Sequence, residues 1–243
     1  MNKYSAKSRR VITKPFLMPF ILVGLLFPLW GFANDITNPL VAAFKNILLI
    51  SHFESALVQF AFYGGYCLMA IPAAIFIKRF NYKQAILMGL ALYSIGCFLF
   101  IPAGKMMVFE AFLVAYFIMT CGLSFLETSA NPYILSMGDE STATQRLNFA
   151  QAFNPLGSLM GMFVAKEFIL AQLNPASETS RLELAQNDPD AFSQIQQNDL
   201  NVIVDPYLIL GIVVGVVFFI FLFSKLPGSN SSDESKLDLK PTL

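Results

Sequence analysis

The sequence predicts an all-α membrane protein with six transmembrane helices, built as a 3+3 inverted repeat. Three observations support this prediction: a very apolar composition, uncharged stretches long enough to cross a bilayer, and a motif that occurs twice at equivalent positions. Of the 243 residues, 56% are hydrophobic and 13% are charged, whereas a soluble domain carries roughly 25% charged residues. The composition therefore excludes a soluble enzyme and a small secreted domain.

Charge balance and metal-ligating residues exclude further classes. Sixteen basic residues balance sixteen acidic ones, so nothing indicates a nucleic-acid partner. One histidine and three cysteines indicate neither a metal site nor a disulfide framework. The sequence also offers no nucleophile–base pair and no glycine-rich phosphate loop. We therefore expect no catalytic residue, no metal and no cofactor.

The uncharged stretches locate the predicted helices. A helix needs ~20 mostly apolar residues to cross the hydrocarbon core, where its backbone must satisfy its own hydrogen bonds. Such stretches occupy residues 16–33, 55–77, 84–104, 111–126, 147–165 and 206–224. The first and the fourth continue past a single acid, Asp35 and Glu127, to about residues 44 and 137. Six crossings are the result.

Basic residues indicate how the helices are oriented. Six crossings put both termini on one side, and that side holds twelve of the sixteen Lys and Arg residues against four on the other. Because Lys and Arg accumulate in cytoplasmic loops, we expect both termini in the cytoplasm and the chain in the inner membrane. The predicted organisation is a cytoplasmic segment (1–15), a six-helix bundle (16–227) with an external loop (173–204), and a disordered tail or linker remnant (228–243). A short surface helix is expected near 181–186.

The two acids within the predicted helices have similar neighbourhoods. Asp35 precedes Asn38–Pro39 and Glu127 precedes Asn131–Pro132, so the two motifs are 92 to 93 residues apart. Helices one and four correspond in this way when the six form two triplets, and an odd number of helices per unit inverts the second triplet. A chance recurrence of Asn-Pro is the alternative.

The same acids indicate a path for an ion or a substrate. An acid near the bilayer centre costs ~2.5–3.5 kcal/mol and usually marks such a path, and no Lys or Arg lies within a predicted helix to pair with it. Other polar residues recur at helical spacing on helices two and five: Gln59, Tyr63 and Tyr66, then Asn148, Gln151 and Asn154. An aqueous cavity lined by helices one, two, four and five would explain them. Interhelical hydrogen bonds are the alternative for any single residue.

Three segments carry a resemblance to a known family. Residues 29–35 (LWGFAND), 126–132 (LETSANP) and 146–154 (RLNFAQAFN) resemble the L-fucose:proton symporter family of the major facilitator superfamily, and the resemblance extends from about residue 15 to 227. It implies a proton-coupled sugar importer that works by alternating access. The family has twelve helices, so the resemblance implies that this chain corresponds to the N-terminal half of such a fold.

The resemblance also implies roles for particular residues. The family's acid on helix four falls on Glu127, and its polar residues on helix five fall on Gln151 and Asn154. On helix one the family's acid falls one turn later, on Asn38, and Asp35 stands where the family has Asn. We expect Asp35 to act from this neighbouring position.

The predicted site combines both lines of reasoning. The proton-coupling residues are Glu127 and Asp35, and the substrate-binding residues are Trp30, Asn34, Asn38, Gln59, Tyr63, Asn131, Gln151 and Asn154. Trp30 has two interpretations, stacking on a sugar ring or packing between helices.

The expected partners are a monosaccharide, a proton, the lipid bilayer and a second six-helix half. That half is a separate chain, a missing C-terminal half or a second copy. Two other classes stay open, a non-transporting half or membrane subunit and a six-helix channel. The sequence does not decide the sugar, nor whether the coupling ion is a proton or sodium.

Overall fold

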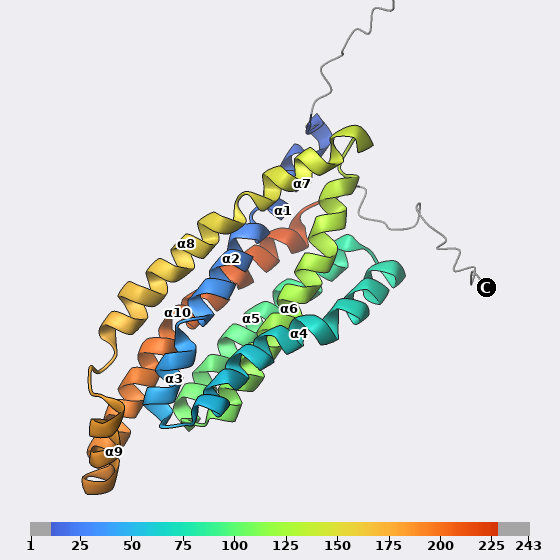
Figure 1. Cartoon of the computed structure of the whole chain (residues 1–243). Helices are drawn as coiled ribbons and strands as arrows, with labels where there is room; N and C mark the ends of the chain where they lie inside the picture. The colour runs from blue at the N-terminus through green and yellow to red at the C-terminus, as the bar shows by residue number, and fades with distance from the viewer. Residues whose placement is uncertain (1–10, 228–243) are drawn as a thin grey trace, which may run out of the picture.

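The computed structural model describes residues 11–227, so most of the predicted N-terminal segment and the whole of the predicted tail lie outside the described residues. Every regular element in the described part is a helix (Figure 1). The all-α prediction is therefore confirmed. Five stretches of residues 11–227 are long and apolar enough to cross a membrane: Lys14–Leu48, His52–Arg79, Tyr82–Met106, Phe109–Ser136 and Pro189–Phe223.

The first crossing is interrupted twice. It consists of a 3₁₀ turn (Lys14–Phe16), α1 (Leu17–Gly24), α2 (Leu26–Thr37) and α3 (Leu40–Leu48). Each interruption precedes or includes a proline, Pro28 or Pro39, which has no N–H to donate to the carbonyl four residues earlier. The second interruption falls at the Asn-Pro motif beside Asp35.

The next three crossings are continuous helices, α4 (His52–Arg79), α5 (Tyr82–Met106) and α6 (Phe109–Ser136). α4 starts at a capping box, in which Ser51 Oγ accepts from the Glu54 backbone N–H and the Glu54 carboxylate accepts from the Ser51 N–H. α6 runs unbroken through Pro132. The second Asn-Pro motif thus leaves its helix continuous, whereas the first divides its helix.

The fifth predicted crossing is divided into two helices. A 3₁₀ turn (Glu140–Thr142) leads into α7 (Ala143–Gln151), and α8 (Asn154–Val164) continues into a π turn (Ala165–Ile169) and a 3₁₀ turn (Leu170–Gln172). The prediction of one continuous helix over 147–165 is wrong in this respect. Pro155 stands in the first turn of α8, where its missing N–H does no harm to the new helix but ends the preceding one.

The last elements are α9 (Glu178–Asn187) and α10 (Pro189–Phe223). α9 covers the short helix expected near 181–186. α10 begins well before the apolar stretch at 206, so much of the segment 173–204 is helical. A buried ion pair between Arg181 Nη2 and Asp199 Oδ2, at 2.5 Å, fastens α9 to the start of α10. The Lys45–Glu178 ion pair fastens α9 to the end of α3.

Close helix pairs follow the pattern of the predicted repeat. α2 of helix one packs along α8 of helix five, and α4 of helix two packs along α6 of helix four. Exchanging helix one with four and helix two with five converts the first pair into the second, as a 3+3 repeat requires. α5 packs against both α6 and α10.

Glycines allow the backbones in these pairs to approach closely. A Cβ on Gly157 would meet the Pro28 carbonyl of α2, and one on Gly31 would meet the Asn154 carbonyl of α8. A Cβ on Gly211 would lie 3.0 Å from Cys97 Cβ of α5. The small-xxx-small pairs at 157/161 and 211/215 therefore lie at helix–helix contacts.

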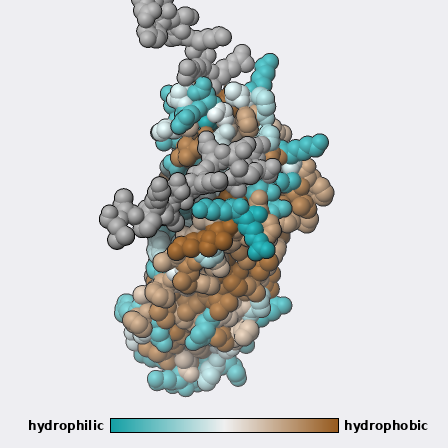
Figure 2. All heavy atoms as spheres, turned by 90° about the vertical axis from the view of Figure 1, so that its right-hand side faces the viewer, coloured by the Kyte–Doolittle hydropathy of each residue, from teal (hydrophilic) through white to brown (hydrophobic). Residues whose placement is uncertain are grey.

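The molecule has an apolar middle between hydrophilic ends, as Figure 2 shows for one face. Large apolar side chains such as Phe60, Ile71 and Phe223 are exposed on the surface of the described residues, which is the arrangement expected of a surface that meets lipid. Arg146 Nη1 donates to the Val11 carbonyl and Tyr133 OH donates to the Pro227 carbonyl. Arg146 of α7 also donates through Nε to the Ile134 carbonyl near the end of α6. The two described ends therefore lie at the same end of α6, as an even number of crossings requires.

Candidate functional site

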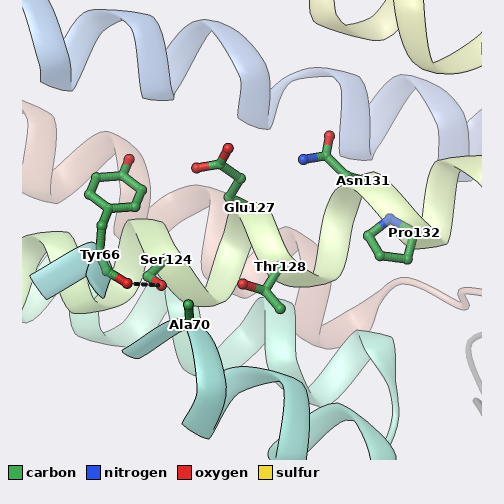
Figure 3. Close-up of a pocket in the computed structure, with 7 residues that line it drawn as sticks. All are labelled: Tyr66, Ala70, Ser124, Glu127, Thr128, Asn131 and Pro132. Atoms are coloured by element: carbon green, nitrogen blue, oxygen red, sulfur yellow. Dashed lines mark hydrogen bonds between the residues drawn. The ribbon is translucent and has the colours of Figure 1, made fainter. Parts of the chain in front are cut away.

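A cavity of about 420 Å³, lined mainly by residues with polar groups, lies between α4 and α6 (Figure 3). The polar ends of Tyr66, Glu127 and Asn131 project from the two helices to the same side of the cavity. The residues that line it are Tyr66 and Ala70 of α4 together with Ser124, Glu127, Thr128, Asn131 and Pro132 of α6. The cavity therefore contains both Glu127 and Asn131, which are four residues apart on α6 and so share a helical face.

The local sequence of α6 explains how Glu127 reaches the cavity. Leu126 and Ser129 are buried, whereas Glu127 is exposed. The Ser129 hydroxyl donates to the Phe125 carbonyl at 2.6 Å, so it needs no partner outside its own helix. The neighbouring Ser124 hydroxyl donates to the Tyr66 carbonyl at 3.3 Å and ties α6 to α4. One helical face thus holds the helix in the bundle while the other presents the acid.

Glu127 has no cationic partner among the residues that the structure describes. The ion pairs among residues 11–227 join Lys45 to Glu178, Lys166 to Glu167 and Arg181 to Asp199. None of them involves Glu127 or Asp35. The carboxyl group of Glu127 is therefore available to a proton or to a bound solute.

Two amides complete this part of the site. Gln151 Nε2, at the end of α7, donates to Asn131 Oδ1 at 3.4 Å. Gln151 lies at the division between α7 and α8, so the interruption of helix five exposes its side chain next to α6. Helices four and five thus contribute Glu127, Asn131 and Gln151 to one polar region.

A second polar group lies at the break of helix one. Gln59 Nε2 of α4 donates to Asn38 Oδ1 at 2.9 Å, and Asn38 Nδ2 donates to Asp35 Oδ1 at 3.3 Å. Asn38 follows the last residue of α2, and the chain turns there into α3. The two positions considered for the helix-one role, Asp35 and Asn38, are thus hydrogen-bonded to each other.

The remaining predicted residues differ in their surroundings. Asn154 Nδ2 donates to the Phe27 carbonyl at 3.2 Å, so this amide joins α8 to α2. Trp30 is 5% exposed and packs edge-on against Phe27, and its Nε1 is buried with no hydrogen-bond partner in the described part of the chain. This favours the packing interpretation of Trp30. Tyr63 is 62% exposed on α4, and Asn34 is half-buried.

A second cavity of similar volume, about 420 Å³, is apolar. It lies between α2, α8 and α10, and Leu29, Phe32, Met160 and Ile209 are among its lining side chains. A sugar presents hydroxyl groups, which need hydrogen-bond partners when they are buried. This cavity therefore lacks the chemistry for a sugar.

Sequence reasoning left three polar lining residues out of the predicted site. Tyr66 shares a helical face with Gln59 and Tyr63, and this spacing was a usable signal. Thr128 and Ser124 carry no such signal, since hydroxyl side chains are common in membrane helices, where they bond their own backbone. Only the packing of α4 on α6 brings them to the cavity.

Comparison with known proteins supports the reading of the fold. Residues 23–241 match the Major Facilitator Superfamily. The chain is 51% identical over 238 residues to the L-fucose-proton symporter of Haemophilus influenzae, covering 95% of this chain and 54% of that protein. It is 34% identical over 223 residues to the L-fucose-proton symporter of Escherichia coli K12, covering 92% and 50%. The Glucose/galactose transporter of Brucella abortus is 33% identical over 216 residues, covering 89% of this chain and 48% of that one.

Comparison with solved structures leads to the same superfamily. The crystal structure of a major facilitator superfamily transporter, FucP, in the outward conformation superposes with a TM-score of 0.78 at 34% identity, covering 92% of this chain and 54% of that one. The chain spans about half the length of the relatives that it matches. It is thus a multi-pass membrane protein, similar to the N-terminal half of fucose:proton symporters, and it belongs to the major facilitator superfamily of transporters.

Proposed function

We propose that this chain is the N-terminal half of a sugar:proton symporter that works by alternating access. One observation carries the proposal: the Glu127 carboxyl group lies at the cavity between α4 and α6 beside two amides and has no cationic partner among the described residues. The relatives named as L-fucose-proton symporters and glucose/galactose transporters give the substrate class, a neutral monosaccharide. We take the proton as the coupling ion, as in the two symporters.

The chemistry of the residues suits such a substrate. A monosaccharide carries several hydroxyl groups, each a donor and an acceptor, and amides match both roles. Asn131 and Gln151 offer amides on one side, and Asn38 and Gln59 offer them beside Asp35. Four further side chains are proposed to contact the solute as it enters or to pack around its binding site. They are Tyr63, Asn34, Asn154 and Trp30.

The proposed cycle needs one proton and no covalent step. Facing the external side, Glu127 takes a proton from water and gains a hydroxyl donor for the sugar. Facing the internal side, it returns the proton to water and loses that donor, which weakens the hold on the sugar. Asp35 is proposed as the second acid of the cycle, paired with Asn38. No bond of the sugar is made or broken, so the chain is not an enzyme.

A second six-helix half is proposed to complete the cavity. Support comes from the length, since the chain spans about half of each relative. That half is a C-terminal continuation, a separate chain or a second copy. In alternating access, two helical bundles move relative to each other around the substrate site. A bundle that supplies one wall of the cavity therefore requires a second bundle.

We further propose that the protein lies in the inner membrane with both termini in the cytoplasm. Twelve of sixteen basic residues belong to that side in the six-helix topology. The 1–15 and 228–243 segments would then be cytoplasmic, and the region around α9 would be external.

The test is uptake of radiolabelled L-fucose, glucose and galactose by cells that produce the chain with a C-terminal half. An imposed inward proton gradient should drive accumulation of one of these sugars. Glu127→Gln should abolish accumulation but leave sugar exchange measurable, because glutamine keeps the hydrogen bonds and cannot carry the proton. Glu110→Gln, an exposed glutamate in the first turn of the same helix, should behave as wild type.

Two results would contradict the proposal. Uphill uptake by the Glu127→Gln variant would remove the coupling role of this acid. Absence of sugar exchange in every combination of halves, with the chain present in the membrane, would favour a non-transporting subunit.

A further inference from the structure

A chain of three buried hydroxyl groups joins three helices near the break of helix one. Tyr116 OH of α6 lies 3.0 Å from Tyr207 OH of α10, and Tyr207 OH lies 3.2 Å from Thr37 Oγ1 of α2. All three side chains are at most 1% exposed. Thr37 Oγ1 in turn donates to the Ala33 carbonyl at 2.8 Å.

The direction of these hydrogen bonds follows from counting hydrogens. A hydroxyl group has one hydrogen to donate, and the hydrogen of Thr37 goes to Ala33. Thr37 must therefore accept from Tyr207, and Tyr207 must then accept from Tyr116. Tyr207 is the central member, because it is the one whose removal breaks both hydroxyl–hydroxyl contacts.

The chain of hydroxyl groups ends at the turn that carries the proposed helix-one site. Thr37 is the last residue of α2, and Asn38 and Pro39 separate it from α3. Pro39 has no N–H, so the Asp35 carbonyl lacks its usual helical donor. A turn that is short of its own hydrogen bonds depends on outside contacts to fix its rotation.

Thr37 and Asn38 lie in different surroundings at this turn. Thr37 is buried toward Tyr207, whereas Asn38 is exposed and bonds Asp35 and Gln59. Because the two residues are adjacent, any rotation that carries Thr37 away from Tyr207 also carries Asn38 away from Gln59. Fixing the position of Thr37 therefore also fixes the position of Asn38.

Aromatic packing keeps the tyrosine hydroxyl groups in place. Phe100 of α5 stacks on Tyr207 with ring centroids 3.9 Å apart and an angle of 6° between the rings. Phe100 and Phe44 also pack edge-on against Tyr116. The rings remain packed in the absence of the hydroxyl groups, so a Tyr→Phe change isolates the hydrogen bonds.

We propose that Tyr207 is a positioning residue for the solute and proton site, because the Tyr116–Tyr207–Thr37 chain fixes the helix-one turn that presents Asp35 and Asn38. The transport part of this inference rests on the proposed function, whereas the positional part does not. Tyr207 touches neither Asp35 nor Asn38 in this account and acts on them through Thr37.

The first test follows the turn directly and needs no transport. Asn38→Cys is introduced in a Cys67→Ser background, since Cys97 and Cys121 are buried. Its reaction with a charged maleimide is timed in open membrane fragments. Tyr207→Phe should slow labelling at least threefold, because the released turn spends less time facing water.

The control is Tyr93→Phe. Tyr93 is fully buried, and its hydroxyl donates to the Leu29 carbonyl of α2 at 3.1 Å, so this variant also removes one buried hydrogen bond to helix one but away from the break. It should leave labelling at position 38 unchanged. Equal labelling rates in Tyr207→Phe, Tyr93→Phe and the parent would overturn the proposal.

The second test measures transport with Asn38 restored. Tyr207→Phe should raise KM for the sugar on the order of fivefold, the factor expected from one net hydrogen bond, with a smaller change in maximal rate. Thr37→Val should reproduce this effect, Thr37→Ser should not, and the Tyr207→Phe/Thr37→Val pair should be no worse than either alone. Additive effects on KM would contradict one continuous chain of hydroxyl groups.

The outcomes separate this inference from the proposed function. Slowed labelling without any sugar transport would retain the positional role and refute the symporter. Normal labelling and normal KM in a working symporter would refute the inference alone. If Tyr207→Phe does not fold, Thr37→Val serves in its place, since it removes the same Tyr207–Thr37 hydrogen bond from the other side.

Discussion

Gly157→Ala should destabilise the bundle by forcing α2 and α8 apart. A Cβ at position 157 would overlap the carbonyl oxygen of Pro28 and lie 2.6 Å from Pro28 Cα, whereas carbon atoms in contact normally lie ~3.5–4.0 Å apart. The obstacle is backbone, so no side-chain rotation relieves it. The helices must separate by on the order of 1 Å, and the Asn154–Phe27 hydrogen bond, already 3.2 Å long, weakens with them.

The expected magnitude is that of overpacking a close contact. Such changes cost about 1–3 kcal/mol, which corresponds to a fall in Tm of roughly 2–12 °C for a chain of this size. The assay is thermal unfolding of the purified chain in detergent. Gly64→Ala is the matched control, since a Cβ there meets nothing within 4 Å. A Tm of the Gly157→Ala variant at or above that of Gly64→Ala would refute the packing argument.

Three further changes test other contacts. Asp199→Asn should cost about 3–5 kcal/mol, because it leaves the buried Arg181 charge uncompensated, and a lower Tm checks it. Ser51→Ala should cost ~1 kcal/mol by removing the cap of α4, seen as faster hydrogen exchange in the first turn of α4 only. Lys83→Met should cost ~1–3 kcal/mol locally, since the Lys83 ammonium donates to two carbonyls at the end of α10. Hydrogen exchange at the end of α10 should be faster in Lys83→Met but not in Lys78→Met.

The crossings could be predicted because lipid imposes a strict rule. Charged side chains are excluded from the hydrocarbon core, so gaps in the charge pattern mark the helices. Five crossings agree with single stretches of the structure. The division of helix five at Gln151 was missed, because a proline at 155 does not by itself reveal whether a helix stops or continues.

The two Asn-Pro motifs illustrate why such breaks need tertiary information. Pro39 divides helix one, whereas Pro132 lies inside a continuous α6. α6 packs along both α4 and α5, and these neighbours hold it straight across the missing hydrogen bond. The two motifs have similar local sequences, so the packing of neighbouring helices decides whether the helix continues.

The candidate site divides in the same way. Glu127 and Asn131 share a face by spacing alone, and the structure places both at the cavity. Asn154 also satisfied the spacing rule, yet its amide bonds the Phe27 carbonyl. The Tyr116–Tyr207–Thr37 chain joins residues 91 and 170 positions apart, so no periodicity within one helix could reveal it.

Proton movement that accompanies sugar movement tests the central claim most directly. Unenergised cells that contain both halves are suspended in weakly buffered medium with a pH electrode, and the transported sugar is added. The account predicts alkalinisation of the medium with wild-type and Glu110→Gln chains, and none with Glu127→Gln, although that variant still exchanges labelled sugar. Alkalinisation of normal size with Glu127→Gln would show that another group carries the proton.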